Sequence, residues 1–223
     1  MAQRIFSQFL EGWLEQYNEV LTRLHLFNKT KHIKWDIVTK QKFVKCFYHA
    51  RGQFYHFLWY LGNYAEDYRI KKMVTFNIEE EFGYTKKSHE QLYMDFAESF
   101  GVDLSTEHID LKYYHKDIQE FNKGHMRWLV NHDNDERLAA FSAYEKLDNI
   151  DYPRLRALAN NIGTTEKGLL FFKVHEQVEH FESTEEYLQD IWDKSPDKII
   201  KAFEFIAEHQ LQMWQDLYRL ISC

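Results

Sequence analysis

The sequence predicts an all-α protein that folds as one bundle of about eight to ten helices. Apolar residues recur at helical spacing along nearly the whole chain, and no segment alternates like a strand. Only two prolines and eight glycines punctuate the 223 residues, and no linker rich in Ser, Gly or Pro divides them. We therefore expect a single domain over residues 1–223.

The first half of the chain is expected to form four helices, each with an apolar stripe at a spacing of three or four residues. A polar connection over 27–38 separates the first two, and Thr39 can cap the second. Residues 102–112 follow the fourth helix as a loop. The helices are expected at about 3–26, 39–61, 65–82 and 86–100.

The second half begins with a helix at about 113–132, and Asp133-Asn134-Asp135 then caps one that runs through Leu147. Asp151-Tyr152-Pro153 starts another, with the proline near its first turn. Thr165-Glu166 opens the next helix. A short helix from Ser183 or Thr184 and a long one over about 196–221 complete the chain.

Composition limits the partners that we expect. A net charge of −7 without a basic stripe argues against nucleic acid as the main partner. No signal peptide and no membrane span is recognisable, and the two cysteines, Cys46 and Cys223, suggest a reducing compartment. We therefore expect a cytoplasmic protein. With 18 Phe, 14 Tyr and 6 Trp, its core is bulky enough to wall off a pocket.

The segment His175–Glu182 carries charge inside an otherwise apolar helix. On a continuous helix His175, Glu179 and Glu182 share one face, whereas His180 points away from it. Buried charges are paired or coordinate a metal, so this face predicts a metal site or an ion-pair network with Arg154 or Arg156. Because position 179 is a glutamate, the zincin motif H-E-x-x-H is excluded.

Three further residues offer inward-facing ligands: Glu81 (or its neighbour Glu80), His89 and Glu145. Considered alone, each of these residues could also have a role other than metal binding. Glu79–Glu81 could be a solvated charge run, His89 a surface histidine, and Glu145 the partner of Lys146 or an arginine. Together with the His175 face they make four carboxylates and two histidines, the inventory of a non-haem di-iron or di-manganese site in a helical bundle.

These segments resemble the haem-oxygenase-like di-metal oxidases and oxygenases. The resemblance lies in Asn77-Ile78-Glu79-Glu80-Glu81-Phe82-Gly83, His89-Glu90-Gln91-Leu92, Ala143-Tyr144-Glu145, and Phe171-Phe172-Lys173-Val174-His175 with Glu179 and Glu182. Within this family the closest resemblance is to the chlamydial proteins that associate with death domains. It covers nearly the whole chain, and at the last motif the sequence departs from the family, because Glu182 stands where the family has histidine.

The resemblance implies a haem-oxygenase-like bundle that binds two iron ions, with manganese or a mixed pair as alternatives. It implies Glu81, His89, Glu145, His175, Glu179 and Glu182 as metal ligands, O₂ and a small organic molecule as substrates, and a homodimer. The chain lacks a mid-chain cysteine matching the nucleophile of the related thiaminase II enzymes. Two other functions stay open, namely a metal-free small-molecule-binding member of the fold and an effector-like interaction protein.

Overall fold

Helices make up the regular structure of the computed structural model, which describes residues 5–32, 34–83, 86–177 and 181–222. No strand occurs in these ranges, which confirms the predicted all-α fold. None of their helices is long and apolar enough to cross a membrane. The longer helices are α1 (Phe6–Arg23), α3 (Ile37–Arg51), α4 (Phe54–Tyr64), α5 (Tyr68–Glu81), α6 (His89–Glu98), α8 (Lys116–Asn131), α9 (Asn134–Asn161), α10 (Glu166–Gln177), α11 (Glu185–Lys194) and α12 (Pro196–Ser222).

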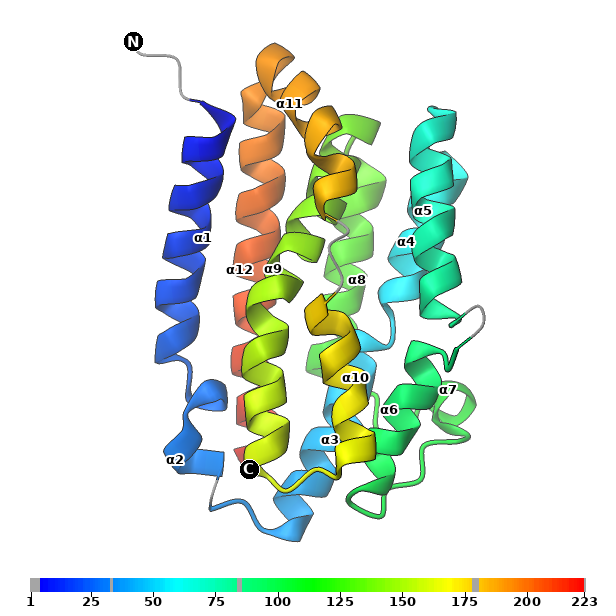
Figure 1. Cartoon of the computed structure of the whole chain (residues 1–223), viewed down its shortest axis with the longest axis vertical. Helices are drawn as coiled ribbons and strands as arrows, with labels where there is room; N and C mark the ends of the chain where they lie inside the picture. Colours follow the sequence, from blue (N-terminus) through cyan, green and yellow to red (C-terminus); the bar gives the residue numbers. More distant parts are fainter. Residues whose placement is uncertain (1–4, 33, 84–85, 178–180, 223) are drawn as a thin grey trace.

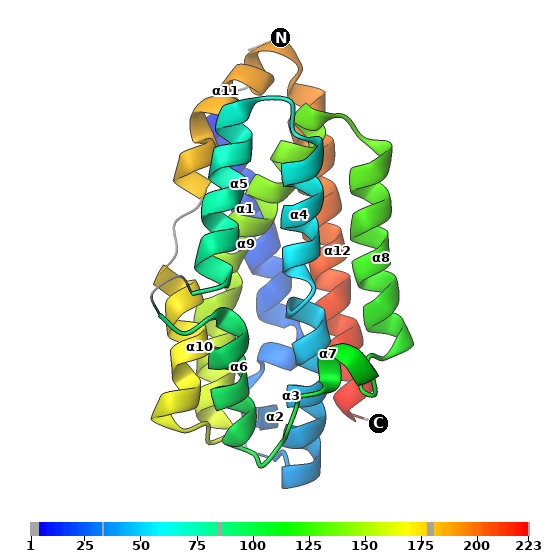
Figure 2. The same cartoon turned by 90° about the vertical axis from the view of Figure 1, so that its right-hand side faces the viewer.

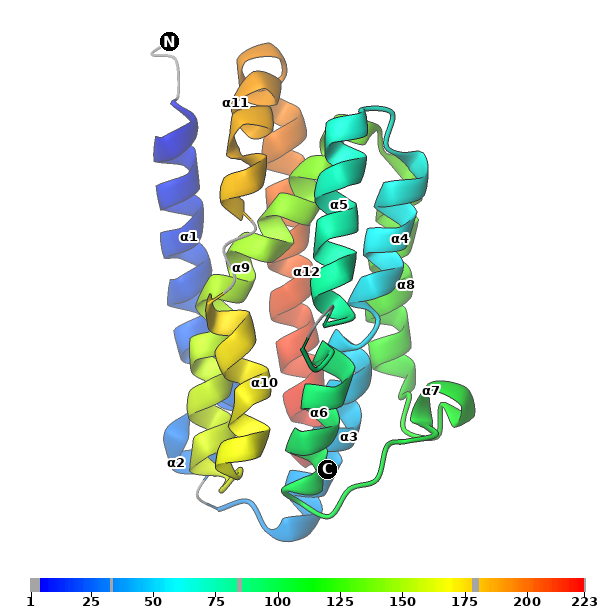
Figure 3. The ribbon, with the colours of Figure 1, turned by 45° about the vertical axis from the view of Figure 1, so that its right-hand side comes forward.

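The two longest helices, α9 and α12, pack against each other along the long axis of the molecule (Figure 1). Around them, α1 lies on one side and α8 on another (Figures 1 and 2). Helices α4 and α5 pack as a pair, and α6 lies below the end of α5, beside α10 (Figure 3). The end of α5 and the start of α6 therefore meet near one flank of α10.

A buried carboxylate joins three of these helices. Asp151 of α9 is fully buried and accepts hydrogen bonds from the Tyr17 hydroxyl of α1 (2.9 Å) and, on α12, from the Gln210 amide (2.9 Å) and the Trp214 indole (3.0 Å). Burial raises the pKa of Asp151 to about 6. Three donors on one carboxylate fix the register of α1 and α12 against α9.

Several boundaries differ from the sequence-based expectation in the first half. The helix expected over 39–61 is divided into α3 and α4 at Gly52, where an added Cβ would lie 2.7 Å from the Tyr48 carbonyl oxygen. Its cap is Asp36 rather than Thr39, because the Asp36 carboxylate accepts the Thr39 amide at 2.8 Å. The expected connection and loop contain short helical turns, namely η1 (His25–Phe27), α2 (Lys29–His32) and α7 (Glu107–Asp110).

The second half also departs from the expectation at Pro153. The two helices expected on either side of residues 148–150 are one helix, α9, with Pro153 inside it. Proline removes one hydrogen bond, to the carbonyl of residue 149, but the buried side chains of Asp151, Tyr152 and Leu155 anchor the helix on both sides of it. Similarly, α10 ends at Gln177, and Glu182 lies in a 3₁₀ turn, η2 (Phe181–Thr184), instead of on the same helix.

Gly83 lies in the connection between α5 and α6, and substituting it tests whether this connection can accommodate a side chain. Its φ is +81°, and an added Cβ would lie 2.5 Å from the Lys87 carbonyl carbon. We expect Gly83→Ala to lower the free energy of unfolding by more than the roughly 1–2 kcal/mol that a left-handed alanine costs. Gly101→Ala is the matched control, because Gly101 has φ +64° with no atom within 4 Å of the added Cβ. Urea denaturation of both variants measures the difference, and equal losses would show that the junction tolerates the side chain.

Candidate metal centre

The antiparallel register of α6 and α10 determines which side chains meet. As the chain advances along α10, its partners on α6 fall back by the same number of residues. The Thr165 and Ser99 hydroxyls lie 2.8 Å apart, Gly168 packs on the backbone of Phe96, and the Phe171 and Tyr93 rings are 4.9 Å apart.

One more turn along the same row, His175 of α10 faces His89 of α6, with their ring centroids 4.2 Å apart. The ordinary packing of small and aromatic residues thus places two imidazoles together.

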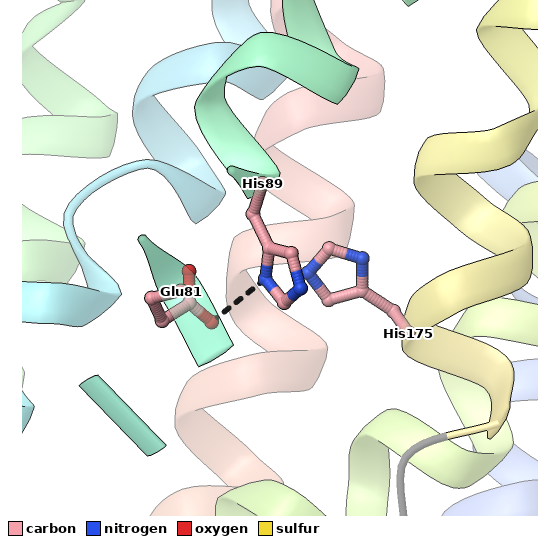
Figure 4. Close-up of side chains that lie close together, drawn as sticks. All are labelled: Glu81, His89 and His175. Atoms are coloured by element: carbon pink, nitrogen blue, oxygen red, sulfur yellow. Dashed lines mark ion pairs between the residues drawn. The ribbon is translucent and has the colours of Figure 1, made fainter. Parts of the chain in front are cut away.

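Glu81, His89 and His175 form a trio at the end of this row. Their candidate ligand atoms all lie within 4.8 Å of one another, and Glu81 reaches the two rings from the end of α5 (Figure 4). Glu81 Oε1 lies 3.0 Å from His89 Nδ1, but this buried nitrogen has no hydrogen bond of acceptable geometry within the described ranges. Two imidazoles and a carboxylate that converge without hydrogen bonding to one another suit a shared divalent cation.

The backbone and a tyrosine fix the orientation of His175. Its Nδ1 lies 2.7 Å from the Phe171 carbonyl oxygen one turn earlier, so Nδ1 carries the proton that this hydrogen bond needs. The Tyr152 ring stacks on the imidazole at 4.3 Å with an interplanar angle of 9°. Because Nδ1 is engaged by this carbonyl, Nε2 is the nitrogen through which His175 would bind a metal, in the way that backbone-bonded histidines commonly do.

Glu145 of α9 lies on the wall of the same cavity and is only 8% exposed. Burial, and then the charges of Asp148 and Glu81, raise its pKa well above the ordinary value. In the part of the chain that the structure describes, no side chain or backbone group makes a hydrogen bond or ion pair with it. The ionised form of this carboxylate lacks a full counter-charge, and a metal ion beside the trio would supply one.

Asp148 and Arg51 are two residues of the site that the sequence analysis missed. The Arg51 guanidinium of α3 is buried and donates to Asp148 Oδ1 at 2.6 Å, while its charge lies 4.7 Å from the centre of the Tyr144 ring. Burial raises the pKa of Asp148 to about 7, whereas Arg51 acts in the opposite direction. Asp148 follows Glu145 by three residues on α9, and this spacing was the available signal.

The remaining predicted ligands are placed differently. Glu182 is exposed in η2 and does not belong to the trio or line the cavity, whereas Glu179 lies outside the described residues. Of the two arginines considered for an ion-pair network, Arg156 pairs with Glu176 at 2.6 Å and Arg154 donates to Asn18 and Thr22. Of the two neighbouring candidates Glu80 and Glu81, it is Glu81 that joins the histidines.

A cavity of about 820 Å³ opens beside these residues, which is large enough for a small organic molecule. Its wall includes Glu81, His89, Glu145, Asp148 and His175 at one end. The rest of the lining is largely aromatic. A substrate held at this end of the cavity would contact the proposed metal ligands directly.

Gly168 tests whether the α6–α10 register positions His175. An added Cβ would lie 2.9 Å from the Phe96 Cα and 2.6 Å from the Ser99 hydroxyl. We expect Gly168→Ala to destabilise the protein by about 1–3 kcal/mol by overpacking, although alanine is intrinsically the better helix former. The matched control Gly12→Ala, in α1 with no atom within 4 Å, should instead stabilise it by up to about 1 kcal/mol. Thermal or urea unfolding measures the change in stability of each variant. Stabilisation by both substitutions would contradict close packing at Gly168.

Asp148→Asn tests the buried ion pair. The substitution leaves the Arg51 charge buried without its counter-ion, so we expect a loss of about 3–5 kcal/mol in the free energy of unfolding. The double variant Arg51→Met/Asp148→Leu should lose less than Asp148→Asn alone, because it removes both charges. Urea denaturation measures each. Glu19→Gln, at an exposed pair with Arg23, is the surface control, and equal effects at the two pairs would contradict the buried role.

Comparison with known protein families gives one match. The model of a family described as iron-containing redox enzymes matches residues 41–208, from within α3 to within α12. This range contains the trio, Glu145, Asp148 and Arg51. A search of curated proteins gives no match. The match is to the family as a whole, so the closer resemblance to chlamydial proteins has no support from it.

Proposed function

The chain belongs to the family of iron-containing redox enzymes, and on that premise we propose that it is a non-haem iron oxidase or oxygenase that uses O₂ to oxidise a small organic molecule. Membership of the family supports an iron-dependent oxidoreductase with a haem-oxygenase-like fold. The use of O₂ and the number of ions are parts of the proposal.

The observation that carries this proposal is the convergence of Glu81, His89 and His175 beside a substrate-sized cavity. Two histidines and one carboxylate are the donor set that non-haem Fe(II) oxygenases use while keeping coordination positions open. The buried Glu145, which has no hydrogen bond or ion pair within the described ranges, is a fourth donor on the same cavity wall. The residues present therefore fit an iron ion.

A second ion is the finer part of the proposal. It would be held by Glu145, Glu179 and Glu182. Their negative charges would offset the repulsion between two divalent cations. Since Glu182 is exposed in η2, its participation requires that segment to turn inward. Iron is the ion that the family supports, and manganese is the alternative.

The residues around the proposed metal site orient the ligand His175 and enclose the cavity beside it. Bound iron supplies the electrons that activate O₂. The Phe171 carbonyl holds the proton of His175 on Nδ1, and the Tyr152 ring prevents the imidazole from turning. The Arg51–Asp148 pair keeps a positive charge beside the carboxylates. Phe171 and Tyr93 close the cavity wall next to the two histidines.

Ligand substitutions test the proposal directly. After anaerobic loading with Fe(II), the wild-type chain should retain iron and show a transient visible absorption on mixing with O₂. We expect His175→Ala and Glu145→Ala to lower the affinity for iron by about 100-fold or more, since both remove a proposed ligand. Metal analysis of the loaded protein and stopped-flow absorption measure the two effects. Glu98→Gln, on the exposed side of α6, is the control that should change neither.

Glu182→Ala separates the two parts of the proposal. If a second ion binds as proposed, this variant should retain one iron per chain where the wild type retains two. No retained iron in the wild type, together with unchanged stability in chelator, would contradict the proposal and favour a metal-free member of the fold.

A further inference from the structure

The lining of the cavity is rich in carboxylates and poor in cations. Glu81, Glu90, Glu145 and Asp148 all line it. Arg51 is the single arginine or lysine among the described lining residues, and it is already paired with Asp148. Away from the trio, the remaining basic side chains of the lining are the imidazoles of His56 and His108, and burial lowers the pKa of His56, so a carboxylate or phosphate would find no permanent positive charge there. A cationic substrate would meet a favourable potential.

One of these carboxylates, that of Glu90, does not belong to the trio and is hydrogen-bonded by a tyrosine. Glu90 follows His89 on α6, and its Oε1 accepts the Tyr48 hydroxyl at 2.7 Å. Tyr55, on α4, lines the same part of the cavity, where burial and then the charge of Glu90 raise the pKa of its hydroxyl. An ionised carboxylate has four lone-pair sites, so one hydrogen bond leaves it able to accept an N–H donor. The neighbouring phenol rings add cation–π attraction.

Three apolar side chains that remain partly open to solvent line the same cavity as this carboxylate. Trp59 is 47% exposed, Phe82 60% and Leu111 47%, and all three line the cavity. They come from α4, the end of α5 and the segment after α7. Large apolar residues that gather around an opening, with a few polar groups between them, are typical of a ligand-binding mouth. They suit the apolar body of a ligand.

We propose that this cavity binds an organic amine, with its ammonium group on Glu90 between Tyr48 and Tyr55 and its apolar body against Trp59, Phe82 and Leu111. The inference rests on the proposed function, in that it names the substrate class of the same cavity. Binding of the ammonium needs no metal. Glu90 is then a specificity-determining residue, because it selects amines over alcohols and acids of the same length.

Calorimetric titration of the metal-free protein with octylamine, octanol and octanoate tests this inference. Octylamine should bind most tightly and octanoate most weakly. Glu90→Gln should weaken the binding of octylamine about tenfold and leave that of octanol unchanged, because it removes the charge. The amide oxygen of the substituted side chain can still accept the Tyr48 hydroxyl, so the wall should stay folded. Trp59→Ala should weaken octylamine and octanol alike, through the loss of apolar contact.

Glu98→Gln is the matched control, because Glu98 lies on the same helix, pairs with Lys167 and does not line the cavity. It should leave all three affinities unchanged. Octanoate binding at least as tight as octylamine, or a Glu90→Gln variant with unchanged octylamine affinity, would overturn the inference. Iron is absent throughout, so a failure of amine binding is distinguishable from a failure of iron binding.

Discussion

The structure depends on how three inward-facing carboxylates of the central helix are neutralised. Glu145, Asp148 and Asp151 lie three residues apart on α9, which packs inside the bundle. Charge in such a position must be compensated. Asp151 is compensated by three hydrogen bonds from α1 and α12, and Asp148 by the guanidinium of α3. Glu145 has no hydrogen bond or ion pair among the described residues, and the charge of Arg51 offsets the effect of its burial only in part. The two compensated carboxylates fix the helices, and the third leaves room for a cation.

The second constraint is geometric. A row of contacts along α6 and α10 begins with the Ser99–Thr165 hydroxyl pair and ends with His89 and His175. Nothing in the first part of the row is specific to a metal. Because helices are stiff, a correct fit at Gly168 is transmitted over two turns to the imidazoles. The histidines are therefore positioned by packing before any ion binds, which is the preorganisation that a metal site requires.

Most of the fold could be predicted from the sequence, and so could four of the six residues around the proposed first iron site. Periodicity indicates the helices, and local motifs indicate Glu81, His89, Glu145 and His175. Arg51 and Asp148 were missed because their pairing joins α3 to α9 across 97 residues, and no local pattern records it. Pro153 wrongly indicated the start of a new helix, because the tertiary packing of α9 outweighs the one hydrogen bond that proline removes. Glu182 was assigned by extending helical periodicity past Gln177, where α10 ends.

The charges of the cavity connect the proposed metal with the proposed amine. At its inner end lie three carboxylates, those of Glu81, Glu145 and Asp148, and one guanidinium, that of Arg51. A single Fe(II) ion balances them. The carboxylate of Glu90 then remains, and an ammonium ion would balance it in turn. A second Fe(II) ion adds two positive charges, so it needs carboxylates from outside this set, and Glu179 and Glu182 are the ones that the sequence offers nearby. On this proposal, occupancy of a second site would depend on Glu179 and Glu182, whereas the first site would depend on the packed helices.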